Sequence, residues 1–119
     1  MKVLIVDDSS FMRSIIKGYL KEFPTLKIAE ASDGDEALKV FSEFQPDVVF
    51  LDIIMPKLNG MEALKTMLKI KKTVKVIMVT SVGESSVIEE ALKIGAEKYI
   101  TKPFKYDDIV GVINEFSQK

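Results

Sequence analysis

Residues 3–13 read VLIVDDSSFMR, an apolar stretch that ends in two adjacent aspartates. Continuous apolar and β-branched residues are typical of a strand covered on both faces, so we predict a strand over Val3–Asp7. Asp7 and Asp8 then place two like charges side by side where the chain has to turn. In the simplest interpretation they cap the next helix together with Ser9, because short polar side chains favour that position.

Beyond this stretch, apolar runs alternate with segments of helical periodicity, separated by short loops rich in Pro, Gly, Ser and Asp. Five such alternations predict an α/β protein with a doubly wound, five-stranded parallel sheet and five helices on both faces. The predicted strands are Val3–Asp7, Leu26–Ala31, Val48–Asp52, Val74–Val79 and Lys98–Ile100, and the apolar helix stripes contain Ala37, Leu38 and Phe41; Leu64, Met67 and Leu68; Ile88, Ala91 and Leu92; Ile109, Val112, Ile113 and Phe116.

The composition narrows the class of protein. A chain of 119 residues fits one domain, residues 1–119. It has no cysteine and no apolar run of membrane-spanning length, so we expect a cytoplasmic protein without a membrane partner. A formal net charge of −1 argues against nucleic acid as a partner, and the lysines between residues 65 and 75 fit a solvated helix end.

Histidine is absent. This excludes a Ser-His triad, an imidazole general base and a zinc site of the usual histidine-rich kind. Any chemistry must therefore come from carboxylates, hydroxyls and lysine.

Polar residues occur where the predicted strands end. Asp7 and Asp8 end the first strand, Asp52 the third, Thr80 the fourth, and Lys102 follows the fifth. Ligands of doubly wound sheets bind at the carboxyl ends of the strands, so these side chains should converge there.

Each of these residues alone also has an ordinary structural explanation. Thr80 is a common type of strand residue, and Lys102 before Pro103 could mark a turn. Asp52 is harder to explain, because an acidic group at the end of an apolar strand is costly to bury without compensation. Three neighbouring carboxylates also repel one another, which predicts a shared divalent cation.

Magnesium fits this site best, with Mn²⁺ as an alternative, because it combines one or two carboxylates with water and phosphate oxygens. One carboxylate could then act as a nucleophile and form an aspartyl phosphate. Lys102 would neutralise a phosphoryl oxygen, and the hydroxyl of Thr80 would donate to another.

The motifs VDD (6–8), LDIIMPKLNG (51–60), VTS (79–81) and YITKPF (99–104), in this order, resemble the receiver domain of two-component response regulators, most closely its single-domain chemotaxis members. The resemblance covers essentially the whole chain. It implies a flavodoxin-like sheet with strand order 2-1-3-4-5.

The resemblance also implies a role for each matching residue. Asp52 is the expected phosphoacceptor, with a histidine kinase as phosphodonor. Asp8, Asp52 and the backbone carbonyl of Ile54 are expected to hold Mg²⁺, with Asp7 acting through a water molecule. Lys102 and Thr80 are expected to contact the phosphoryl group, and the Lys102–Pro103 bond is expected to be cis.

A switch is implied as well. Thr80 is expected to move on phosphorylation, and Tyr99 to rotate inward behind it. We define the output surface as the residues expected to bind the downstream protein: Ile88, Lys98, Tyr99 and Tyr106. Ordinary core packing is the alternative for Ile88, and it is our expectation for Leu92.

Other positions bear on the lifetime of the phosphoryl group. Ile54 and Val82 are apolar where many fast-cycling receivers carry polar side chains that guide the hydrolytic water. We therefore expect slow autodephosphorylation, and no other enzymatic activity beyond self-phosphorylation. Ser81 is small, as access of the phosphodonor requires.

We expect a stand-alone, monomeric regulator without an attached effector domain, because the chain ends just after the last predicted helix. SSFMR (9–13) favours a role in chemotaxis, with a flagellar motor switch or adaptor protein as target. An intermediate receiver in a phosphorelay, which passes its phosphoryl group to a phosphotransferase, is the alternative.

Two further classes fit less well. A flavin-binding electron carrier needs a phosphate loop after the first strand, where DDSSFMR (7–13) would repel phosphate. A haloacid-dehalogenase-like phosphatase has its nucleophile on the first strand and needs a cap insertion.

Overall fold

Five parallel strands form the centre of the computed structural model, which describes residues 1–55, 58–81 and 85–117, with the backbone alone at 54, 55 and 58. The order of the strands is β2-β1-β3-β6-β7, which confirms the predicted 2-1-3-4-5 topology. The strands are β1 Lys2–Val6, β2 Lys27–Ala31, β3 Val48–Asp52, β6 Lys75–Ser81 and β7 Lys98–Lys102.

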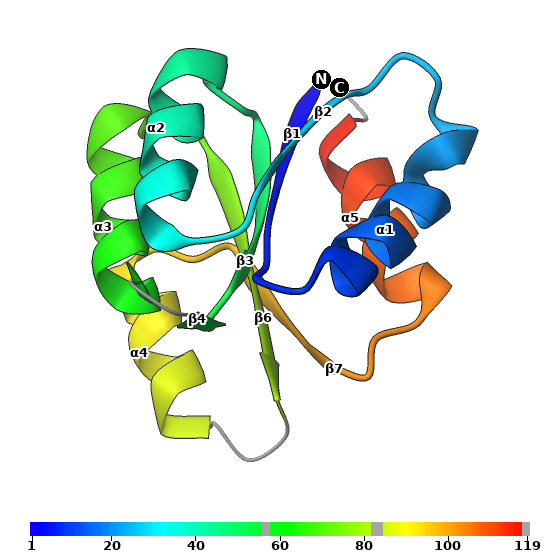
Figure 1. Ribbon diagram of the computed structural model, residues 1–119. Coiled ribbons are helices and arrows are strands. Elements are labelled where there is room, and N and C mark those ends of the chain that lie inside the picture. The colour runs from blue at the N-terminus through cyan, green and yellow to red at the C-terminus, as the bar shows by residue number, and fades with distance from the viewer. Residues whose placement is uncertain (56–57, 82–84, 118–119) are drawn as a thin grey trace.

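Helices cover both faces of the sheet (Figure 1). Side chains of alternate strand residues point to opposite faces, so each strand contributes to two cores. α2, α3 and α4 pack on one face, where Phe41 and Met67 are fully buried. α1 and α5 pack on the other, against Phe50 and Ile77. The helices are α1 Ser10–Tyr19, α2 Gly34–Phe44, α3 Gly60–Ile70, α4 Ser85–Ile94 and α5 Tyr106–Ser117.

Side-chain caps fix where several helices begin. Ser9 caps α1 by accepting a hydrogen bond from the amide of Met12 at 3.2 Å. Asp33 caps α2 by accepting from the amide of Glu36 at 2.9 Å, and Asn59 caps α3. Each cap satisfies amides that the first turn leaves without a partner, and thereby sets the loop length after a strand.

Several strand boundaries differ from the prediction. β6 and β7 are longer than expected, because Thr80 pairs with Thr101 and Ser81 with Lys102 across the two strands. A short antiparallel pair, β4 Ile54–Met55 and β5 Leu58–Asn59, and a 3₁₀ turn, η1 Leu20–Glu22, were not predicted.

The prediction that Leu92 belongs to the core is wrong. Leu92 is 41% exposed, whereas Ala91 is buried. Successive helix residues are about 100° apart around the axis, so the residue after the buried Ala91 turns away from the sheet.

The two ends of the described chain lie together, at the edge of the sheet where the strands begin. Met1 and Ser117 line one hollow there, together with Val48 and Lys75. The carboxyl ends of the strands lie at the opposite edge (Figure 1). Among the helices that the structure describes, none has the length and apolarity needed to cross a lipid bilayer.

Candidate functional site

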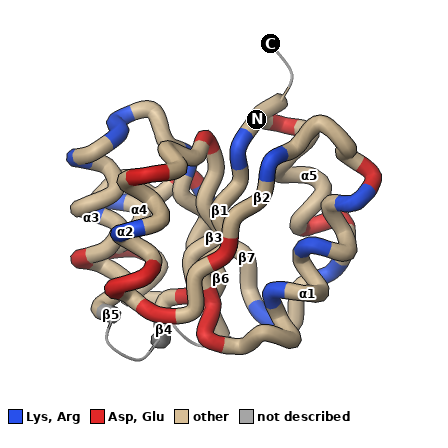
Figure 2. The backbone as a smooth tube through the Cα atoms, turned by 45° about the horizontal axis from the view of Figure 1, so that its top comes forward, with Lys and Arg blue, Asp and Glu red and all other residues tan. Residues whose placement is uncertain are grey.

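Three aspartates meet at the carboxyl ends of β1 and β3. Asp7, Asp8 and Asp52 each direct one carboxylate oxygen into a cluster in which these oxygens lie within 4.8 Å of one another. Asp7 and Asp52 are only 3% and 7% exposed, while Asp8 faces solvent. In Figure 2, acidic segments gather along the lower edge of the tube. The sequence therefore identified the carboxylates that the fold brings together.

Lys102 joins two of these carboxylates from the end of β7. Its Nζ lies 3.3 Å from Asp7 Oδ2 and 3.2 Å from Asp52 Oδ2. Burial alone would lower the pKa of Lys102, but the charges and hydrogen bonds of Asp52 and Asp7 outweigh it and raise the pKa above 10.5. Lys102 is thus held as a cation between the two strand ends. The next peptide bond, Lys102–Pro103, is cis, as predicted.

The donor set fits a divalent cation. Lys102 offsets one of the three carboxylate charges, which leaves the charge that one divalent ion balances. The clustered donors are all carboxylate oxygens, the ligand type preferred by Mg²⁺ and Mn²⁺. The cluster could therefore hold such an ion, with its exposed side at Asp8.

Thr80 lies beside this cluster. The sheet register pairs Asp52 with Val79, the residue before Thr80. Thr80 is 2% exposed, and its hydroxyl donates to the carbonyl of Ser81 at 3.3 Å. Ser81 itself is exposed, so the described surface beside the acidic cluster is lined by a small side chain.

The two positions related to the phosphoryl lifetime are only partly described. Ile54, which lies two residues after Asp52, begins β4. Its backbone pairs with that of Asn59. Val82 lies outside the described residues.

Helix capping does not explain the aspartate pair. Ser9 provides the cap of α1, and its amide donates to Asp7 Oδ1 at 2.9 Å. Asp7 is thus bonded on one oxygen to this loop and on the other to Lys102. The alternative of a purely structural cap is therefore wrong for Asp7 and Asp8.

The residues of the output surface come from β7 and from the two helices next to it in the chain, α4 and α5. Tyr99 is 48% exposed, and Ile88 on α4 is half-buried. Lys98 forms an ion pair with Glu115 on α5. The ring of Tyr106 packs edge-on against Tyr19 of α1 at 5.5 Å, so Tyr106 faces the α1 side of α5.

Arg13 and Glu30 adjoin the site and were not singled out from the sequence. Arg13 Nη1 donates to the backbone carbonyl of Asp7 at 2.6 Å, and its Nε donates to Glu30 at 2.9 Å. A basic residue on the first helix gives no sign that its partner is a main-chain oxygen. The sequence therefore offered no signal for this contact.

Comparisons with known proteins agree with this geometry. The family described as the response regulator receiver domain matches residues 3–114. Chemotaxis protein CheY of Thermotoga maritima is 38% identical over 98% of both chains. The chain also matches part of a longer protein of that organism, a protein-glutamate methylesterase/protein-glutamine glutaminase, with 46% identity over 87% of this chain and 30% of the relative.

Solved structures give the same result. The receiver domain of NtrX from Brucella abortus superposes with a TM-score of 0.87 at 30% identity, over 95% of both chains. The chain spans 26% of the longer NtrX structure, with the same TM-score.

Proposed function

The chain belongs to the response regulator receiver family, and from this membership we propose that it is a phosphoacceptor signalling protein that is phosphorylated on Asp52 by a histidine kinase. In that transfer, the phosphorus–nitrogen bond of a phosphohistidine breaks and a bond from phosphorus to an Asp52 oxygen forms. The histidine nitrogen keeps the electron pair of the broken bond.

The observation that carries this proposal is the setting of Asp52. It is a buried carboxylate at the end of a central strand, clustered with Asp7 and Asp8 and paired with Lys102. A buried acid that served structure alone would not need two further acids beside it.

We assign the metal ligands as Asp8, Asp52 and the backbone carbonyl of Ile54, with Asp7 acting through a water molecule. When bound, Mg²⁺ supplies positive charge that neutralises the oxygens of the transferring phosphoryl group. Lys102 would contact one of these oxygens from its position beside Asp52, and the hydroxyl of Thr80 would donate to another.

The proposed switch is the pair Thr80 and Tyr99. Thr80 would turn its hydroxyl from the carbonyl of Ser81 to the phosphoryl group, which frees space behind it. Tyr99, which is exposed in this structure, would then turn inward and change the output surface.

We further propose that residues 1–119 act alone, as a cytoplasmic monomer in control of motility. The full-length match to chemotaxis protein CheY supports this role, with a flagellar motor switch or adaptor protein as the target. The partial matches to longer proteins support the alternative of a receiver unit within a larger regulator. A phosphorelay intermediate is the third candidate, and a pull-down with the phosphorylated protein separates motility targets from a phosphotransferase.

Incubation with Mg²⁺ and a small-molecule phosphodonor, followed by intact-mass spectrometry, tests the central proposal. We expect one phosphoryl group per chain, lost in D52N and retained in D107N, which changes an exposed aspartate of α5. The label should persist beyond seconds. Catalytic turnover of the phosphodonor without a stable label would instead indicate a phosphatase, and undiminished labelling of D52N would refute the assignment of Asp52.

A further inference from the structure

Arg13 connects helix α1 to the loop that carries Asp7 and Asp8. Its Nη1 donates to the backbone carbonyl of Asp7 at 2.6 Å, and its side chain is only 15% exposed. A hydrogen bond from a charged donor is about twice as strong as a neutral one, so this contact holds the carbonyl firmly.

The held carbonyl belongs to the peptide unit that joins Asp7 to Asp8. A peptide unit is planar, so fixing its oxygen also fixes the nitrogen and Cα atoms of Asp8, from which its side chain extends. The next peptide unit is held by the amide of Ser9, which donates to Asp7 Oδ1 at 2.9 Å, so rotation of the Asp8 backbone is restricted on both sides. Asp7 has additional anchors, since its amide donates to the carbonyl of Ala31 at 3.1 Å and its carboxylate is bonded to Ser9 and Lys102.

The carboxylate of Asp8 has no such anchors. It is exposed and makes no hydrogen bond or ion pair with the residues that the structure describes. The orientation of Asp8 toward the cluster therefore depends on its backbone, and hence on the contact between Arg13 and Asp7.

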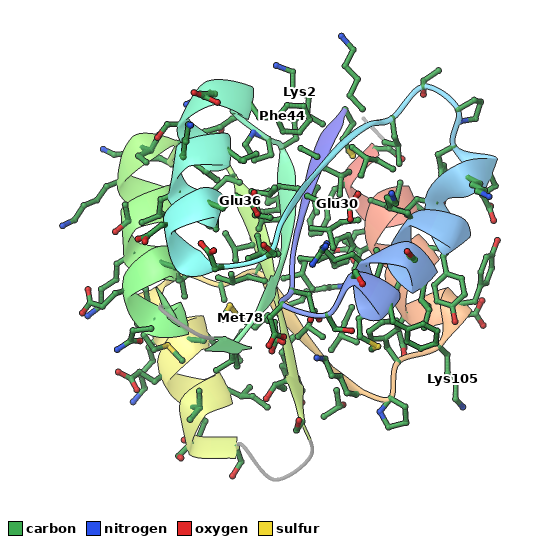
Figure 3. The ribbon with its side chains drawn as sticks, viewed as in Figure 1. Lys2, Glu30, Glu36, Phe44, Met78 and Lys105 are labelled. Atoms are coloured by element: carbon green, nitrogen blue, oxygen red, sulfur yellow. The ribbon has the colours of Figure 1, made fainter. Side chains whose placement is uncertain are left out.

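Glu30 of β2 holds the guanidinium of Arg13 in place. It lies between β2 and α1 (Figure 3), accepting from Arg13 Nε at 2.9 Å and from Lys17 Nζ at 2.8 Å. Because Glu30 also offsets the charge of Arg13, the guanidinium can approach the acidic loop with little repulsion of a cation bound there.

We propose that Arg13 is a positioning residue for the divalent-cation site, which orients Asp8 by holding the Asp7 carbonyl between α1 and β1. This inference rests on the proposed Mg²⁺ site. Arg13 would not touch the ion and would act through the Asp7–Asp8 peptide unit.

Whether removal of the Arg13 charge raises or lowers the affinity for Mg²⁺ distinguishes this positioning role from a simple electrostatic one. Removing a nearby positive charge should strengthen the binding of Mg²⁺ if charge alone matters. Releasing the Asp7–Asp8 peptide should weaken binding, and loss of a residue that orients a metal ligand typically costs about 10-fold or more in affinity.

Calorimetric titration of the whole chain with Mg²⁺ gives the test, with R13A as the variant and K17A as its matched control. K17A removes a positive charge of the same helix from the same partner, Glu30, but leaves the Asp7 carbonyl bonded. We expect R13A to lose about 10-fold in Mg²⁺ affinity, and K17A to bind as wild type or slightly more tightly. R13K should fall between wild type and R13A, because one ammonium cannot reproduce the planar fork of the guanidinium.

Mg²⁺ affinity in R13A equal to or higher than that of wild type would overturn the inference, as would an equal loss in K17A. If R13A is not folded by circular dichroism, R13Q replaces it, since its shorter side chain also cannot hold both partners, and the same outcomes apply. Failure of the wild-type chain to bind Mg²⁺ would refute the proposed function itself, which keeps the two failures distinct.

Discussion

Lys102 and Asp52 lie 50 residues apart in the chain, yet Lys102 Nζ is 3.2 Å from Asp52 Oδ2. The same ammonium reaches Asp7, so one cation stabilises two buried carboxylates at the ends of neighbouring strands. The stability of the protein and the chemistry of its acidic cluster are therefore coupled.

Replacing Lys102 by methionine should destabilise the metal-free protein by about 3 kcal/mol, because it removes the cation that offsets the charge of two buried carboxylates. The pKa of Lys102 is raised, so the stabilising effect is complete below 10.5 and is lost only as the pH rises through the higher pKa of the folded state. From pH 7 toward 10.5 the difference between wild type and K102M should stay constant.

Urea unfolding in the presence of a chelator measures this difference. K105M is the control, since Lys105 is exposed and its substitution should change stability by about 0.5 kcal/mol or less. Saturating Mg²⁺ should narrow the gap between K102M and wild type. A K102M protein as stable as wild type without metal would show that Lys102 does not hold the carboxylates together.

Low pH should remove the contribution of Glu30 to the free energy of unfolding. The hydrogen bond from Lys17, together with that from Arg13 and the charges of both residues, outweighs burial and lowers the pKa of Glu30 below 4.5. Because the pKa is lowered on folding, this stability is present above 4.5 and is lost as the pH falls through the lower pKa of the folded state.

E30Q should therefore be less stable than wild type at neutral pH, and the gap should close as the pH falls below 4.5. Urea unfolding of both proteins over a pH series checks this, with E43Q as a control for loss of a negative charge. A gap that does not depend on pH would mean that Glu30 acts through packing alone.

Gly60 lets the start of α3 pack closely against the backbone of Ile53, which an alanine at position 60 would prevent. A Cβ atom there would lie 2.9 Å from the carbonyl oxygen of Ile53, the residue after Asp52. G60A should thus lose about 1–2 kcal/mol of stability and weaken Mg²⁺ binding, because Ile53 must move.

Gly111 in α5 provides the opposite control, since a Cβ there would meet nothing within 4 Å. G111A should gain about 0.5–1 kcal/mol from better helix propensity, without a change in Mg²⁺ affinity. Chemical unfolding and metal titration of both variants measure these effects. Wild-type Mg²⁺ affinity in G60A would contradict a coupling between Gly60 and the loop after Asp52.

Phosphorylation should shield Tyr99. In this structure the ring is 48% exposed, and we expect its accessibility to a soluble paramagnetic probe to fall when Asp52 is phosphorylated. T80A should accept the phosphoryl group but leave Tyr99 accessible, because it lacks the hydroxyl that would turn toward the phosphoryl group. Equal shielding of Tyr99 in both proteins would exclude Thr80 from the switch.

Much of the fold could be predicted because a sheet that is buried on both faces requires strands that are apolar at nearly every residue, and such runs are visible in the sequence. Val48–Asp52 was predicted with its observed bounds, since nearly every residue of this central strand is apolar. The antiparallel pair β4 and β5 was missed because strands of two residues are too short to show alternation.

The candidate site was predictable where chemistry coincides with the end of a strand, as for Asp7, Asp52 and Lys102. The contact between Arg13 and the Asp7 carbonyl was not predictable in the same way. Its acceptor is a backbone atom that every residue carries, and only the relative placement of α1 and β1 selects it.

Met1 and Ser117 share a hollow at the edge where the strands begin, opposite the edge that carries the cluster of Asp7, Asp8 and Asp52. This arrangement makes the molecule well suited to genetic fusion. A fluorescent domain could be joined at either end, or a short linker could connect the ends for circular permutation, while the acidic cluster at the opposite edge would stay uncovered.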